Sequence, residues 1–83
     1  MKKTYAIDLE GKSSPLALQR LFAAAVPVPR DYGRNLDAMY DVLTEYGGGW
    51  RLEFKNSANA PEAFKQVCLD AAADTPGLEI SFD

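Results

Sequence analysis

The stretch "NLDAMYDVLTEYGGGWRLEFK", residues 35–55, changes from one hydrophobic period to another and decides the fold class. Before the three glycines, apolar residues recur three or four positions apart, which predicts a helix. After them, Trp50, Leu52 and Phe54 alternate with charged residues, which predicts a strand. The glycines predict a flexible stop that ends the helix. A helix that leads directly into a strand favours an α/β protein.

The same two periods continue outward from this stretch in both directions. Residues 3–11 alternate apolar and polar side chains and predict a first strand, and residues 13–25 predict a helix. Beyond the central strand, residues 56–74 predict a third helix and residues 78–82 a last strand. The predicted order is therefore β-α-α-β-α-β.

This order predicts the topology, because strands separated by helices pair in parallel through right-handed crossovers. We expect an α/β fold with a three-stranded parallel sheet and helices packed mainly on one face. The alternation within each strand predicts that the other face of the sheet stays partly exposed to water. At 83 residues, the chain is expected to form one domain over residues 1–83.

The charge and residue composition exclude several functional classes. The formal net charge is −3, and the nine basic residues are spread from Lys2 to Lys65, which argues against a nucleic-acid-binding surface. An acidic protein of this size favours a basic partner. With no histidine and one cysteine, a metal or other cofactor is not expected. The single Cys68 and the absence of a signal peptide or membrane span predict a cytoplasmic protein.

The connector before the central helix is expected to be short and rigid. Pro27 and Pro29 disfavour a helical conformation in the residues that precede them. Gly33 permits backbone conformations that other residues avoid. Asn35 is a predicted helix cap, and Asp37 lies in the first turn, where the helix dipole favours an anion.

The central helix is predicted to have one apolar and one acidic side. At 100° per residue, the apolar side consists of Leu36, Met39, Leu43 and Tyr46, with Tyr40 at its edge. The opposite side carries Asp37, Asp41 and Glu45 in i, i+4 steps, with Thr44 beside them. Like charges at this spacing destabilise a helix by roughly 0.2–0.5 kcal/mol per pair. The row favours a partner that supplies the missing cations, although a purely structural acidic surface is an alternative.

Catalytic and metal-binding interpretations of these acids are weaker. Two carboxylates one helical turn apart resemble a glycosidase pair, but a convex helix face provides no cleft. The pattern of a calcium loop is absent, and the glycines lack the lysine and hydroxyl residue of a phosphate loop. Cys68 lies on the apolar stripe of its helix and is expected to be a core residue.

Protein binding remains the best interpretation of the segment. Carboxylates accept paired hydrogen bonds from arginine, and tyrosines bury a large area at low entropic cost. An acidic row near Tyr32, Tyr40 and Tyr46 suits the groove of a protein that binds polyanions, such as a nuclease. The carboxylates would then occupy the places of substrate phosphates.

The segment "VPRDYGRNLDAMYDVLTEY", residues 28–46, resembles the signature of the barstar family of intracellular inhibitors of secreted bacterial ribonucleases. The matching residues are Pro29, Tyr32, Gly33, Asn35, Leu36, Asp37, Ala38, Tyr40, Asp41, Leu43 and Thr44. The length and element order also agree with the family. The resemblance implies a non-enzymatic protein, monomeric when free, whose central helix and preceding loop enter a ribonuclease active site.

The resemblance also implies a role for individual residues. Asp41 would meet the catalytic cationic cluster, Asp37 neighbouring basic residues, and Asp70 a peripheral basic residue. The implied partner-binding set is Tyr32, Gly33, Asn35, Leu36, Asp37, Ala38, Tyr40, Asp41, Thr44, Tyr46 and Asp70. Asp31, Tyr40 and Tyr46 replace aromatic residues of the best-known member, two of them tryptophans. The alternative function is therefore an immunity protein or binding module for a different basic toxin or partner. A small carboxylate-dependent hydrolase is a further alternative.

Overall fold

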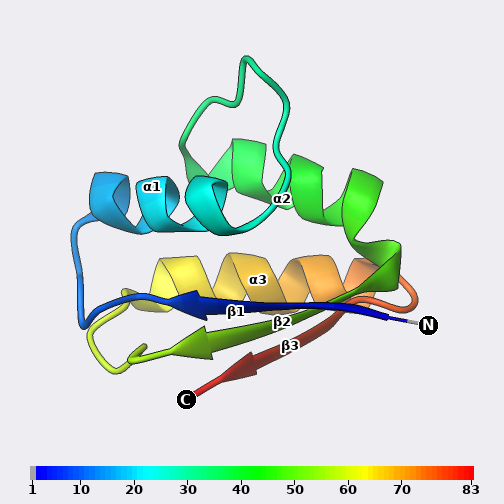
Figure 1. Ribbon diagram of the computed structural model, residues 1–83. Coiled ribbons are helices and arrows are strands. Elements are labelled where there is room, and N and C mark those ends of the chain that lie inside the picture. Colours follow the sequence, from blue (N-terminus) through cyan, green and yellow to red (C-terminus); the bar gives the residue numbers. More distant parts are fainter. Residues whose placement is uncertain (1) are drawn as a thin grey trace.

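The computed structural model describes residues 2–83 and has the predicted order of elements, β-α-α-β-α-β (Figure 1). The elements are β1 (Lys3–Asp8), α1 (Pro15–Ala25), α2 (Leu36–Tyr46), β2 (Trp50–Lys55), α3 (Glu62–Asp74) and β3 (Glu79–Phe82). A short 3-10 turn, Gly47–Gly49, joins α2 to β2. The three glycines are thus a structured turn and not the flexible stop that the sequence predicted. Gly47 is buried, and a Cβ added there would lie 3.2 Å from Leu78.

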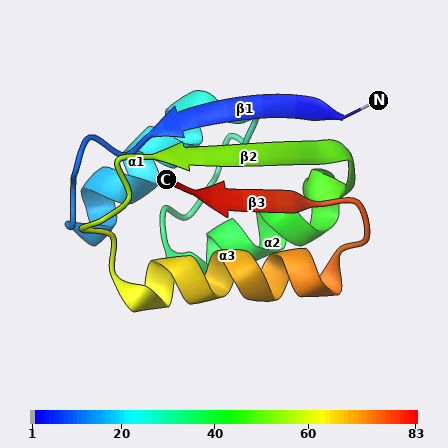
Figure 2. The ribbon, with the colours of Figure 1, turned by 90° about the horizontal axis from the view of Figure 1, so that it is seen from below.

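The sheet has the order β1-β2-β3, and both strand pairs are parallel. In the register, Leu52 of the central strand is paired with Tyr5 on one side and with Ile80 on the other. Both crossovers advance across the sheet in the same direction, so crossovers of one hand place all helices on one face. Figures 1 and 2 show this arrangement: the strands form one layer, the helices lie on one side of it, and α3 runs along the β3 edge. The predicted fold is confirmed.

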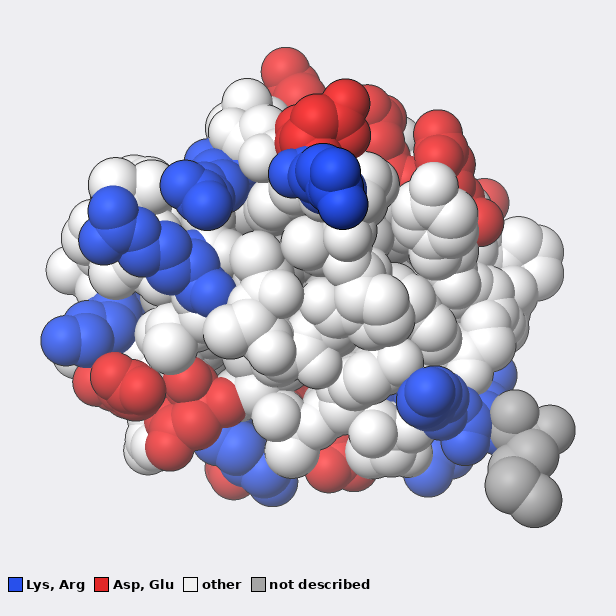
Figure 3. All heavy atoms as spheres, turned by 45° about the horizontal axis from the view of Figure 1, so that its top comes forward, with Lys and Arg blue, Asp and Glu red and all other residues white. Residues whose placement is uncertain are grey.

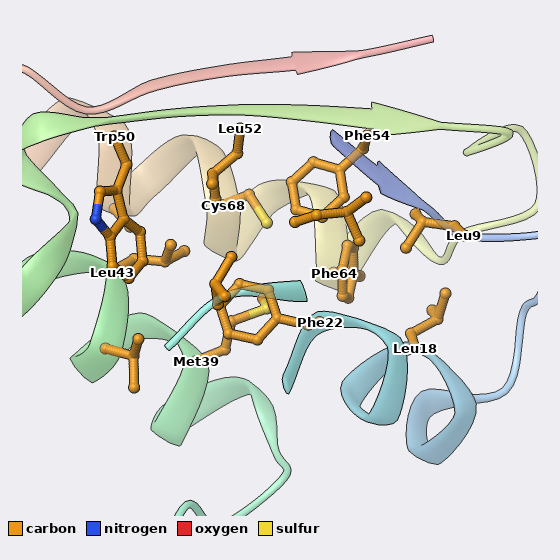
Figure 4. Packing of buried hydrophobic residues seen from close by; sticks show 14 of the residues in the cluster. Leu9, Leu18, Phe22, Met39, Leu43, Trp50, Leu52, Phe54, Phe64 and Cys68 are labelled. Carbon is orange, nitrogen blue, oxygen red and sulfur yellow. The ribbon is translucent and has the colours of Figure 1, made fainter. Parts of the chain in front are cut away.

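The core lies between the sheet and the helices. Leu52 and Phe54 point from β2 toward the helices, where they meet residues from all three of them (Figure 4). The labelled partners are Leu18 and Phe22 on α1, Met39 and Leu43 on α2, and Phe64 and Cys68 on α3. Cys68 is fully buried, as predicted, and burial raises the pKa of its thiol to about 12.

The opposite face of the sheet is polar, as the alternation predicted. The three ion pairs found within residues 2–83 all involve residues of this face or the strand ends. Lys2 Nζ lies 3.6 Å and Arg51 Nε 2.9 Å from the Glu79 carboxylate, and Lys55 Nζ lies 3.7 Å from Asp83. The hydrogen bond from Arg51 lowers the pKa of Glu79. These pairs engage three of the nine basic residues on the side away from the helices.

Candidate partner-binding site

A buried chain of hydrogen bonds holds the loop before α2 in place. The Tyr32 ring packs beside Phe22, with centroids 6.0 Å apart, and its hydroxyl donates to Oε1 of Gln19. Gln19 is only 2% exposed, and its Nε2 donates to the Met39 sulfur at 3.6 Å. Burial raises the pKa of Tyr32. Tyr32, predicted to contact a partner, is therefore half-buried and also acts as an internal anchor. The burial of Gln19 was not predicted, because a polar residue on a helix is ordinarily expected to be exposed.

The left-handed residue of the loop is Arg34, not Gly33. Arg34 has φ +54°, whereas Gly33 is not among the residues with positive φ. Gly33 does not use the conformational freedom that a glycine permits, and the space around it is what favours a residue without a Cβ. A Cβ at Gly33 would lie 3.3 Å from the Asn35 side chain and 3.4 Å from the Ala38 Cβ. The glycine thus lets the loop lie directly against the first turn of α2.

Asn35 caps α2, as predicted. Its extended backbone (φ −142°, ψ 174°) directs Oδ1 toward the helix, where it accepts a 2.8 Å hydrogen bond from the Ala38 amide. Asp37 lies in the first turn, where exposed backbone amides favour a negative charge. At the other end, the Thr44 hydroxyl donates to the Tyr40 carbonyl at 3.0 Å, so this predicted contact residue is half-buried and bound to its own helix.

The two sides of α2 differ as predicted, with two exceptions. Asp37, Asp41 and Glu45 are exposed, and Met39 and Leu43 are buried. Val42 is also buried, which the helical projection missed. Tyr46, assigned to the apolar side, is instead 53% exposed. Tyr46 is the last residue of α2. Its side chain borders a shallow hollow that the Pro27–Pro29 segment and Trp50 also line.

Two carboxylates of α3 lie next to this acidic row. Asp70 and Asp74 are one helical turn apart and exposed, and the Tyr40 hydroxyl donates to the Asp74 carboxylate. This hydrogen bond, together with the nearby charges of Asp70 and Asp41, raises the pKa of Tyr40. Asp70, which was predicted to make a peripheral partner contact, lies beside the acidic row of α2. Asp74 was missed, although its i, i+4 spacing from Asp70 was visible in the sequence.

The five carboxylates therefore form one acidic surface, which we define as Asp37, Asp41, Glu45, Asp70 and Asp74. None of the ion pairs found within residues 2–83 includes any of them. Figure 3 shows acidic side chains gathered along the upper edge of the molecule, with basic side chain atoms beside them and other charged groups toward the left and the lower edge. The surface is a cluster of charge without internal neutralisation.

Comparison with known proteins identifies the family. The family model for barstar, described as a barnase inhibitor, matches residues 2–77. The chain belongs to the barstar family. No curated protein matches its sequence closely enough to be counted as a relative. The match covers the cap, the α2 acids and both α3 acids of this barstar-family chain.

The structure adds two observations on alternative chemistry. In the part of this barstar-family protein that the structure describes, no three His, Cys, Asp or Glu residues are placed to hold a metal ion. No helix within residues 2–83 is long and apolar enough to span a membrane. The exposed acids of α2 and α3 thus remain the chemically distinctive feature of the surface.

Proposed function

We propose that this barstar-family protein is a non-enzymatic, cytoplasmic inhibitor that blocks a secreted bacterial ribonuclease by filling its basic groove with the acidic surface. The observation that supports this most strongly is that five exposed carboxylates on two adjacent helices have no cationic partner within residues 2–83. An unneutralised row costs stability, and a partner with arginine and lysine side chains removes that cost. The family description, a barnase inhibitor, agrees with such a partner.

The proposed mechanism assigns different roles to parts of the surface. Asp41, in the middle of the row, occupies the place of a substrate phosphate among the catalytic cations, and Asp37 contacts basic residues at its side. Carboxylates accept paired hydrogen bonds from arginine, and these bonds are strong when water is excluded. Asp70 and Asp74 extend the charge toward the periphery, where it orients the approaching partner.

The direct test is binding to barnase, measured by calorimetry and by stopped-flow association at several salt concentrations. We expect the wild type to bind and Asp41→Ala to bind much more weakly, with association slowing as salt rises because mobile ions screen the attraction. Such steering is best known from the barnase–barstar pair itself, so the expectation follows that precedent. Equal affinity of the two proteins, or wild-type association insensitive to salt, would contradict the mechanism.

A different basic toxin is the second candidate partner. Asp31 and Tyr46 are both exposed, and both differ from the aromatic residues of the best-known family member. These changes alter the edge of the contact surface and not the carboxylate row. A pull-down against secreted proteins of the source organism, with Asp41→Ala as the control bait, distinguishes the two: the candidate that the wild type captures and the variant loses is the partner.

A further inference from the structure

A mainly apolar pocket opens where the three helices begin. It has a volume of about 230 Å³ and receives side chains from all three helices, among them Leu18, Leu36 and Phe64. Its lining comes from the N-terminal parts of α1, α2 and α3 and from the residues just before α2 and α3. None of the five carboxylates of the acidic surface lines the pocket, and the family description assigns it no role.

The pocket is continuous with the proposed binding site. Arg34, Asn35 and Leu36 line it, and the last two belong to the segment that was predicted to contact a partner. Asp37, the first acid of the row, follows them directly in the sequence. A protein that covers the beginning of α2 therefore also covers the mouth of the pocket.

The lining selects the chemistry of the group that enters. No carboxylate lines the pocket, and its one charged residue is Arg34, so a cationic side chain is disfavoured. The Gln19 amide is already engaged, since its oxygen accepts from Tyr32 and its nitrogen donates to Met39. An apolar group is favoured, and a cavity of about 150 Å³ is large enough to hold a benzene ring.

We propose that one aliphatic or aromatic side chain of the bound ribonuclease, located beside its basic groove, inserts into this pocket. The proposal rests on the proposed function and divides the interface into two parts. The carboxylate row attracts and orients the partner in a salt-dependent way. The pocket contributes apolar burial, which salt at moderate concentration hardly weakens.

The test is to fill the pocket from the surface. Ala63 lines it and is exposed on α3, so Ala63→Leu adds volume without disturbing the buried core. The matched control is Ala24→Leu, because Ala24 is an exposed helical alanine that does not line this pocket. Calorimetry with barnase should show a loss of about ten- to a hundred-fold for Ala63→Leu, by the same factor at low and high salt, and no loss for Ala24→Leu.

A second measurement needs no substitution. In the wild-type complex, intermolecular NMR contacts should connect the methyl groups of Leu18 and Leu36 to an apolar side chain of the ribonuclease. If the wild type binds barnase but Ala63→Leu binds equally well, or these contacts are missing, the pocket proposal fails and the proposed function stands. If the wild type does not bind barnase and Asp41→Ala changes nothing, both fail for this partner.

Discussion

Gln19 is the residue that links the binding loop to the interior. It sits on α1 between the loop and α2, and it accepts a hydrogen bond from Tyr32 while donating to Met39. A buried amide is stable only when its polar atoms have partners. The conformation of the loop, and hence the position of the α2 cap, therefore depends on one hydroxyl of a residue that also belongs to the candidate binding site.

Replacement of Tyr32 by phenylalanine is expected to destabilise the fold. It removes the donor to Gln19 Oε1 and leaves a buried acceptor unpaired, which costs about 1–3 kcal/mol. The free energy of unfolding in urea measures the effect. Tyr46→Phe is the control, since Tyr46 is 53% exposed and its loss of a hydroxyl should change stability by less than about 0.5 kcal/mol. Similar values for both variants would show that the buried hydrogen bond contributes nothing.

Cys68 is expected to make stability fall in alkaline solution. Burial raises the pKa of its thiol from 9.0 to about 12. Below pH 9 the thiol is protonated in both the folded and the unfolded state, so it does not make the free energy of unfolding depend on pH. Between pH 9 and 12 the thiol loses its proton in the unfolded state but keeps it in the folded state, so the free energy of unfolding falls by up to about 1.4 kcal/mol per pH unit. Urea unfolding at pH 8, 9.5 and 10.5 should show a steeper decline for the wild type than for Cys68→Ala. Parallel declines would rule out a contribution from the thiol.

At the scale of the element, the N-terminus of α2 is stabilised by its cap and its first acid, whereas its C-terminus carries an unfavourable negative charge. Asn35 caps it and Asp37 complements its dipole, but Glu45 lies in the last turn, where no basic residue offsets it. Glu45, which belongs to the acidic row proposed to face a basic groove, thus reduces the stability of the helix when the protein is free.

Glu45→Gln is therefore expected to stabilise the free protein. The change removes repulsion from Asp41 and from the helix C-terminus, for a gain of about 0.3–1 kcal/mol in the free energy of unfolding. Asp37→Asn, which also removes one charge from the row, should give no gain because it loses a favourable dipole interaction. Thermal and urea unfolding at low salt provide the comparison. A gain for Asp37→Asn as large as that for Glu45→Gln would refute the role of the dipole.

The elements were predictable from sequence because each carries a clear period and its own boundary residues. The alternation of Trp50, Leu52 and Phe54 and the cap at Asn35 both appear in the structure as predicted. The site was predictable only in part. The burial of Gln19 and the meeting of Tyr40 with Asp74 depend on contacts between elements, which periodicity within one element does not contain. The positive φ of Arg34 likewise could not be predicted, because its residue type does not favour that conformation.

Over the whole molecule, charge is divided between two faces. Lys2, Arg51 and Lys55 are paired with acids at the sheet, whereas the acidic surface on α2 and α3 has no such partners within residues 2–83. Helices α2 and α3 together carry six acidic residues and one basic residue, Lys65, so the net charge of −3 understates the acidity of these two helices. The position of the acidic residues on the surface, more than the net charge of the protein, should govern association with a basic protein.

Two variants that change the net charge in opposite directions separate these effects. Asp41→Asn makes the protein less acidic at the proposed contact, and Lys55→Gln makes it more acidic on the sheet face. We expect Asp41→Asn to weaken barnase binding strongly and Lys55→Gln to change the dissociation constant by less than about three-fold, because distant exposed charges are screened. Surface plasmon resonance at physiological salt measures both. Tighter binding of Lys55→Gln comparable in size to the loss in Asp41→Asn would show that net charge dominates.

The strand order also has a consequence for folding kinetics. Leu52 in the central strand is paired with Ile80, 28 positions later in the sequence, and with Tyr5, 47 positions earlier. Closing the longer chain segment costs more entropy, so docking of β1 is expected to follow the assembly of β2, α3 and β3. The loop with Tyr32 and the Asn35 cap lies inside that longer segment. A newly made chain would thus gain its recognition loop only in the last step of folding, after its acidic helix α3 is already in place.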